Sequence, residues 1–202
     1  MKKYLLPIIT ALALENSPMR AQGTFQYDQQ SVPADIITGS SAVIQSNSPI
    51  GQSFIPSLSA VGFIRLCLDD VNKGNNLGAT VYVNLHQDSI TGPIIGSTQP
   101  VFMPDSFENL TNFFFPTPVA VTPGTTYYFE PVVQSGDSWY VVAYNFGYTG
   151  GTAYYKGLAD PFTDLWFREG VVVPEPSSVL LISIGAGALT YVRRRHTAKR
   201  RA

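Results

Sequence analysis

Apolar and polar residues alternate through the middle of the chain, which is the pattern of strands that bury one face. The clearest run is 79–86, in which the apolar side chains fall at Val81, Val83 and Leu85. Comparable runs recur at short intervals and end at clusters of Gly, Pro, Asn and Asp, which favour turns. The pattern predicts strands at 52–55, 61–68, 79–86, 93–97, 112–115, 118–121, 125–133, 138–145, 152–156 and 165–168.

About ten short strands at a spacing of roughly 8–12 residues, with no helix of useful length between them, are typical of a β-sandwich or barrel. We therefore predict an all-β domain over 22–171, built as a two-sheet antiparallel sandwich. Thr122-Pro123-Gly124 predicts a type II turn that leads into the aromatic strand at 125–133. This segment resembles one common in jelly-roll-like modules of secreted bacterial proteins, and the resemblance implies the fold rather than an activity.

The N-terminus departs from this alternating pattern. Lys2 and Lys3 precede an apolar stretch at 4–14, and a short apolar stretch after positive charge is the signature of a secretory signal peptide. We expect a signal peptide over 1–21, with cleavage after Ala21.

The C-terminus departs from it as well. Residues 179–192 are apolar and uncharged, and six Lys or Arg follow within the last ten residues, beginning with Arg193, Arg194 and Arg195. Fourteen helical residues span about 21 Å, less than the roughly 30 Å of a bilayer core. We expect a short transmembrane helix over 177–192 whose basic tail, 193–202, acts as a cytoplasmic stop-transfer signal.

Val173, Pro174, Glu175 and Pro176 stand just before the apolar stretch. Each proline fixes its own φ and biases its predecessor away from helix, so the motif is expected to be extended. Motif, apolar helix and basic cluster together, over 172–202, resemble the PEP-CTERM sorting signal of Gram-negative bacteria. The resemblance implies export, transient anchoring in the inner membrane, processing by an exosortase-type membrane protease and delivery to the cell surface or outside.

Charge and cysteine content narrow the function of the domain. Between residues 24 and 173 four cations face twelve acids, a net charge of −8. Because an acidic surface repels phosphate, we expect no nucleic-acid partner. Cys67 is the only cysteine, so the domain forms no internal disulfide, and its apolar neighbours predict a buried, unreactive thiol.

No residue pattern marks a catalytic, cofactor or metal site. His86 is the only histidine before the tail, and no Gly-x-Ser-x-Gly segment occurs, so we interpret His86 as a residue of the sheet rim. The loop from Asp69 to Asn76 offers oxygen donors of the kind calcium prefers, but its spacing does not match an EF-hand. We expect a protein that is not an enzyme and has no cofactor.

Aromatic residues gather around the glycine-rich stretch 147–151. Exposed aromatic faces beside amide and carboxylate side chains suit sugar rings, although core and edge packing is the more common reason for such residues. The candidate sugar contacts are Tyr144, Tyr148, Tyr154 and Tyr155, while Trp139 and Trp166 are expected to be buried. The sequence thus favours a structural or adhesive protein of the surface or matrix. A carbohydrate-binding module for extracellular polysaccharide and a secreted polysaccharide hydrolase remain as alternatives.

Overall fold

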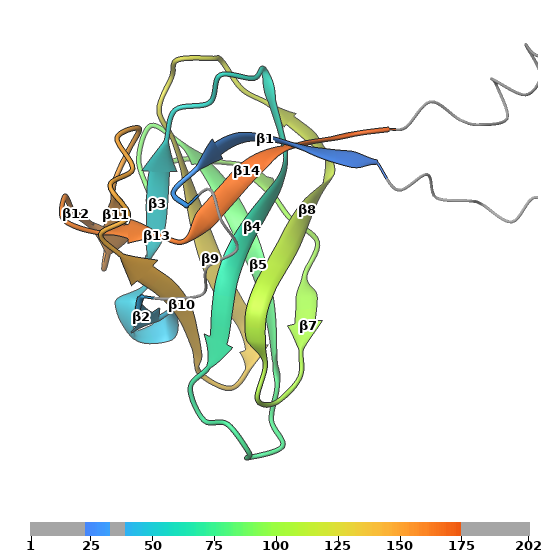
Figure 1. The fold of residues 1–202 in the computed structure, drawn as a ribbon, viewed down its shortest axis with the longest axis vertical. Helices are drawn as coiled ribbons and strands as arrows, with labels where there is room; N and C mark the ends of the chain where they lie inside the picture. The colour runs from blue at the N-terminus through green and yellow to red at the C-terminus, as the bar shows by residue number, and fades with distance from the viewer. Residues whose placement is uncertain (1–22, 33–38, 175–202) are drawn as a thin grey trace, which may run out of the picture. The chain divides into compact units, whose positions relative to one another are not determined.

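The computed structural model describes residues 23–32 and 39–174. Within these ranges the chain forms fourteen strands and one turn of 3-10 helix (Gln45–Asn47), arranged in two antiparallel sheets (Figure 1). Sheet A contains β1 (Thr24–Gln30), β2 (Ser40–Val43), β4 (Ala60–Asp70), β8 (Glu108–Ala120), β10 (Trp139–Tyr144), β13 (Asp164–Leu165) and β14 (Phe167–Val173). Sheet B contains β3 (Gly51–Phe54), β5 (Ala79–Gln87), β6 (Ile94–Ser97), β7 (Val101–Met103), β9 (Tyr127–Gly136), β11 (Ala153–Tyr155) and β12 (Leu158–Asp160).

One main core lies between the two sheets. The alternation seen in the sequence supplies it: Val81, Val83 and Leu85 of β5 are fully buried and belong to the same cluster as the inward side chains of β4. Aromatic rings fill the centre, with the Phe129 and Phe167 centroids 5.2 Å apart across the sheets. The predicted all-β fold with two antiparallel sheets is confirmed, and it is consistent with a jelly-roll-like sandwich.

The strands differ from the predicted ones where polar residues or prolines obscure the pattern. β8 is one strand of thirteen residues, where the sequence predicts two, at 112–115 and 118–121. Its pairing with β4 shifts register between Val61 and Phe63, so a bulge falls around Pro116 and Pro118. Pro cannot donate to a ladder and is tolerated at such bulges.

The turn predicted at Thr122-Pro123-Gly124 is confirmed. Gly124 has φ +80, and the Thr125 amide donates to the Thr122 carbonyl at 3.1 Å. A type II turn requires positive φ at its third residue, which glycine adopts without strain. This turn places β9 beside β5 in the middle of sheet B.

A smaller cluster covers the outer face of sheet A, where Cys67, Val142 and Trp166 are buried together. Burial raises the pKa of Cys67 to about 12, so the prediction of an unreactive buried thiol is confirmed. Trp139 and Trp166 are also fully buried, as expected.

The compact unit runs from Thr24 to Val173, compared with the expected domain limits of 22 and 171. The expected signal peptide (1–21) and transmembrane helix (177–192) lie outside the described residues. Among the described residues, no helix is long and apolar enough to cross a membrane.

Candidate functional site

The first and last strands of the unit pair with each other directly before the candidate sorting motif. Thr24 lies opposite Val173 and Phe25 opposite Val172 in the β1–β14 ladder. β14 pairs with β4 only from Phe167 to Gly170, so in the described ranges the ladder partner of 171–173 is β1. Val173 is therefore the end of a two-stranded ribbon, and the exposed Pro174, which has no N–H, follows it.

Of the other residues assigned to the sorting signal, Glu175, Pro176, Arg193, Arg194 and Arg195 lie outside the described part of the chain. The structure therefore places the beginning of the motif and no more.

A buried polar cluster fixes the β1–β14 pair to the sandwich. The backbone amide of Gln29 donates to Glu169 Oε1 at 3.0 Å, and the Tyr148 hydroxyl donates to the side-chain oxygen of Gln29, Oε1, at 3.1 Å. Burial raises the pKa of Glu169 to about 9, and the nearby Asp28 adds to the shift. Burial would raise the pKa of Asp28 too, but hydrogen bonds led by the Ser57 hydroxyl outweigh it and lower that pKa. Glu169 is thus protonated at neutral pH while Asp28 is ionised.

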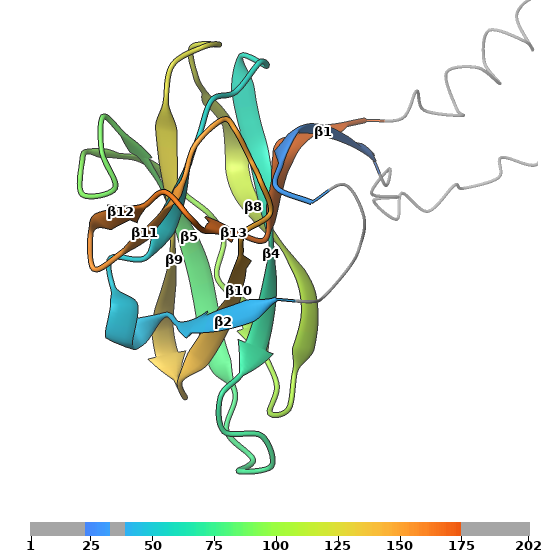
Figure 2. The same ribbon diagram turned by 60° about the vertical axis from the view of Figure 1, so that its left-hand side comes forward.

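The second candidate region is a hollow of about 630 Å³ where β2 of sheet A faces β11 of sheet B. In Figure 2, β2 lies in front of β10 and below the β11–β12 hairpin. The hollow is lined by Ser40, Ser41, Ala42, Val43, Asn47, Tyr140, Ala143, Tyr144, Asn145, Tyr155, Phe162 and Thr163. The four tyrosines predicted as sugar contacts divide here, because Tyr144 and Tyr155 line the hollow and the other two do not.

Backbone hydrogen bonds hold the walls of the hollow in place. The Lys156 amide donates to the Asn47 carbonyl at 2.8 Å, which ties the β11–β12 hairpin to the 3-10 turn. The Ala153 amide donates to the Thr163 carbonyl at 3.0 Å, which ties β11 to the loop that carries Phe162. The hollow therefore has a preformed frame.

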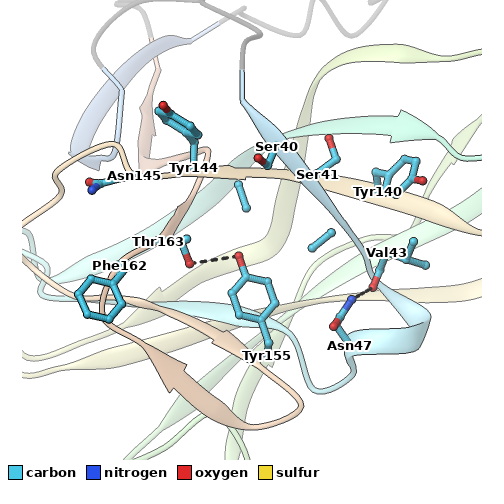
Figure 3. Close-up of a pocket in the computed structure, with 12 residues that line it drawn as sticks. Ser40, Ser41, Val43, Asn47, Tyr140, Tyr144, Asn145, Tyr155, Phe162 and Thr163 are labelled. Atoms are coloured by element: carbon cyan, nitrogen blue, oxygen red, sulfur yellow. Dashed lines mark hydrogen bonds between the residues drawn. The ribbon is translucent and has the colours of Figure 1, made fainter.

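The side chains around this frame are aromatic, neutral polar or aliphatic (Figure 3). Thr163 donates to the Tyr155 hydroxyl at 3.2 Å, and Asn47 donates to the Val43 carbonyl at 2.8 Å. Burial raises the pKa of Tyr155, so its phenol stays protonated. Because that oxygen already accepts from Thr163, its own proton is available to a ligand.

Tyr148 and Tyr154 have other roles. Tyr148 packs edge-on against Phe167, with ring centroids 5.2 Å apart, and belongs to the polar cluster beside Glu169. Tyr154 packs edge-on against Tyr128 at 5.6 Å. The sequence suggested Tyr148 and Tyr154 because they flank the glycine-rich stretch, but proximity along the chain does not bring them to the hollow. Phe162 and the serines of β2 enter it instead, and no pattern in the sequence distinguishes them.

The remaining candidates are His86 and the acidic loop. His86 is 4% exposed rather than a rim residue, and its ring lies 2.9 Å from the Gly92 carbonyl and 3.2 Å from Glu130. Burial alone would lower the pKa of His86, but the hydrogen bonds to Glu130 and Gly92 raise it.

The acidic loop after β4 is engaged in local hydrogen bonds. Asp69 pairs with Lys73 at 2.8 Å, and Asp70 accepts from the Asn72 and Ser106 amides at 2.8 Å. Within 23–32 and 39–174, no group of three or more acids, histidines or cysteines is placed to hold a metal. These carboxylates order the turn between β4 and β5.

Comparison with known proteins identifies the C-terminal region. The family model described as "PEP-CTERM protein-sorting motif" matches residues 172–195, which span Pro174-Glu175-Pro176, the apolar stretch and the first arginines. No curated protein and no solved structure is significantly similar to the chain. The molecule is thus an all-β domain that ends in a sorting signal, and that signal is a PEP-CTERM motif. A motif of this class implies export and an exosortase as processing partner.

Proposed function

We propose that this chain is an exported protein of the cell surface or extracellular matrix, with a structural or adhesive role and no catalytic activity. The supporting observation is the sorting motif at 172–195, which begins at the last two residues of a compact β-sandwich. The expected signal peptide at 1–21 begins export, and the helix at 177–192 holds the chain in the inner membrane until an exosortase processes it.

The composition of the hollow supports a role without catalysis. None of the described residues that line it is an acid, a histidine or a cysteine. General acid–base catalysis relies most often on such groups, and a Ser or Thr nucleophile is activated by an adjacent general base. Glu169, whose pKa is raised to about 9, has no exposed surface and so has no access to a substrate.

The test follows the chain in its native host with an epitope tag in the exposed turn at 73–75. Wild type is expected at the surface or in the medium, shortened at the C-terminus. Glu175→Gln, combined with Pro174→Ala and Pro176→Ala, is expected to leave the full-length chain in the inner membrane. Asp88→Asn, which neutralises an exposed acid of the domain, is the matched control and is expected to sort normally.

If the triple variant is shortened and delivered like wild type, the proposed route is wrong. Cell fractionation with immunoblotting for position and mass spectrometry for the new C-terminus gives both readouts.

The hollow favours a second candidate function, recognition of extracellular polysaccharide. Hydrolysis of such a polysaccharide, the third candidate, has less support because it requires a pair of carboxyl groups beside the glycosidic bond. The described lining of the hollow contains none.

A further inference from the structure

We propose that the hollow between β2 and β11 binds a segment of neutral polysaccharide. This inference rests on the proposed function, since export is what brings the domain into contact with such a polymer. It names the class of ligand that the side chains of this one site suit.

The size of the hollow suits a small number of sugar rings. Its volume of about 630 Å³ falls inside the range of roughly 300–1,000 Å³ that is usual for small-ligand sites. The backbone links from Lys156 to Asn47 and from Ala153 to Thr163 fix its two sides. A preformed site binds without the cost of ordering its walls.

Aromatic rings at the rim supply the apolar part of sugar recognition. The side chain of Phe162 is 76% exposed and that of Tyr144 is 53% exposed, each a large value for an aromatic residue beside a hollow. Figure 3 shows Phe162 and Tyr155 side by side, with Tyr144 on the strand across from them. The face of an aromatic ring is weakly negative and attracts the polarised C–H groups on the flat face of a pyranose.

Neutral polar groups supply the hydrogen bonds. In the described ranges, the side chains of Ser40, Ser41 and Asn145 line the hollow and take part in none of the protein's own hydrogen bonds. Hydroxyl and amide groups both donate and accept, as the hydroxyl groups of a sugar do. Together with the free phenol proton of Tyr155, they match a ligand rich in hydroxyl groups.

Charge selects a neutral sugar over an acidic one. No Lys or Arg occurs among the described residues that line the hollow, so a uronic acid or sulfate group would have no cation to pair with. The domain between residues 24 and 173 also has a net charge of −8, which repels polyanions. The site therefore fits neutral chains and disfavours acidic ones.

The experiment measures binding of the full chain, purified in a detergent without a sugar headgroup. The probes are immobilised neutral glucans, mannans and galactans, with alginate and polygalacturonate as the acidic arm. Wild type is expected to bind at least one neutral polymer. Phe162→Ala and Tyr144→Ala are each expected to weaken that binding by roughly tenfold, a factor that corresponds to about 1.4 kcal/mol.

Phe102→Ala is the matched control, because Phe102 is an aromatic residue of β7 with 67% exposure and does not line the hollow. All three side chains are exposed, so thermal melts of the variants are expected to match wild type and to exclude unfolding as the cause.

Binding to no neutral polymer, binding only to the acidic polymers, or equal binding by wild type and both hollow variants would each overturn the inference. These results are separate from the sorting test. A chain that reaches the surface but binds no sugar refutes the site alone, and a chain that binds sugar in vitro but is never exported refutes the proposed function.

Discussion

Glu169 is an acidic residue in a buried environment. It projects from β14 into the core with no exposed surface, opposite Ile64 of β4. An ionised carboxylate there would lose its hydration, and the ionised Asp28 nearby would oppose it further. The protein accommodates the acid by keeping it protonated, with a pKa of about 9. Keeping Glu169 protonated costs no stability at a pH where this residue is also protonated in the unfolded chain. At higher pH it does cost stability.

Stability is therefore expected to fall as pH rises. Above the ordinary glutamate pKa, about 4.3, the unfolded chain releases the Glu169 proton while the folded chain keeps it until about pH 9. Between these values the unfolded state binds fewer protons, so the free energy of unfolding decreases by at most about 1.4 kcal/mol per pH unit. Glu169→Gln keeps the acceptor for the Gln29 amide and removes the titration.

The measurement is thermal or urea unfolding of wild type and Glu169→Gln from pH 5 to pH 9. The difference between the two proteins isolates Glu169, because Asp164 and His86, whose pKa values are also raised, contribute equally to both. The free energy of unfolding of Glu169→Gln, relative to that of wild type, is expected to increase steadily with pH. A difference that stays constant across this range would show that Glu169 does not titrate as described.

At the scale of elements, β1 controls the last residues before the sorting motif. Gly170 marks the point where β14 leaves β4, and a methyl group at Gly170 would overlap the Gln26 carbonyl and approach the Tyr27 Cα to 3.0 Å. The two strands thus approach closely only because residue 170 is glycine. Beyond that point the ladder consists of two strands, which are marginally stable by themselves.

Gly170→Ala is accordingly expected to displace β1 from β14 and to raise the rate of amide hydrogen exchange in both 24–27 and 171–173. Gly74→Ala is the control: Gly74 has φ +85 and open space around it, so alanine there adds only local strain of about 1 kcal/mol. Exchange followed by mass spectrometry distinguishes the two. Unchanged protection of 171–173 in Gly170→Ala would mean that β1 does not hold the end of β14.

The local sequence pattern predicts strands that have one apolar and one polar face. It fails for strands whose two faces have the same polarity. The apolar residues of β5 alternate along the sequence, which predicts the strand within one residue of its bounds. β1, Thr-Phe-Gln-Tyr-Asp-Gln-Gln, is mostly polar and was missed, since its place depends on pairing with β14 at the other end of the chain. The same limit applies to the hollow: Ser40 and Phe162 meet through long-range strand pairing, which no local spacing encodes.

At the scale of the whole molecule, the sandwich ends at Val173, and the matched sorting motif begins within its last two residues. The main core draws its buried residues from 44–167, and the ladder that closes the unit ends with the Thr24–Val173 pair. The domain needs no disulfide, because the chain has a single cysteine. From these features we expect the stability of the domain to be independent of the segments that flank it.

A chain limited to 22–173 is therefore expected to fold in a reducing cytosol and to melt within about 2 °C of the full chain in detergent. A chain limited to 22–170 is the matched control. It lacks the residues that pair with Thr24, Phe25 and Gln26, and it frees the Phe25 ring that packs 5.0 Å from Phe63. Its midpoint is expected to be lower by at least about 3 °C, the shift that ~1 kcal/mol produces in a domain of this length.

If 22–173 melts as low as 22–170, residues beyond Val173 stabilise the sandwich and the division at Val173 is wrong. Equal midpoints for 22–170 and the full chain would instead show that the terminal ribbon contributes nothing to stability.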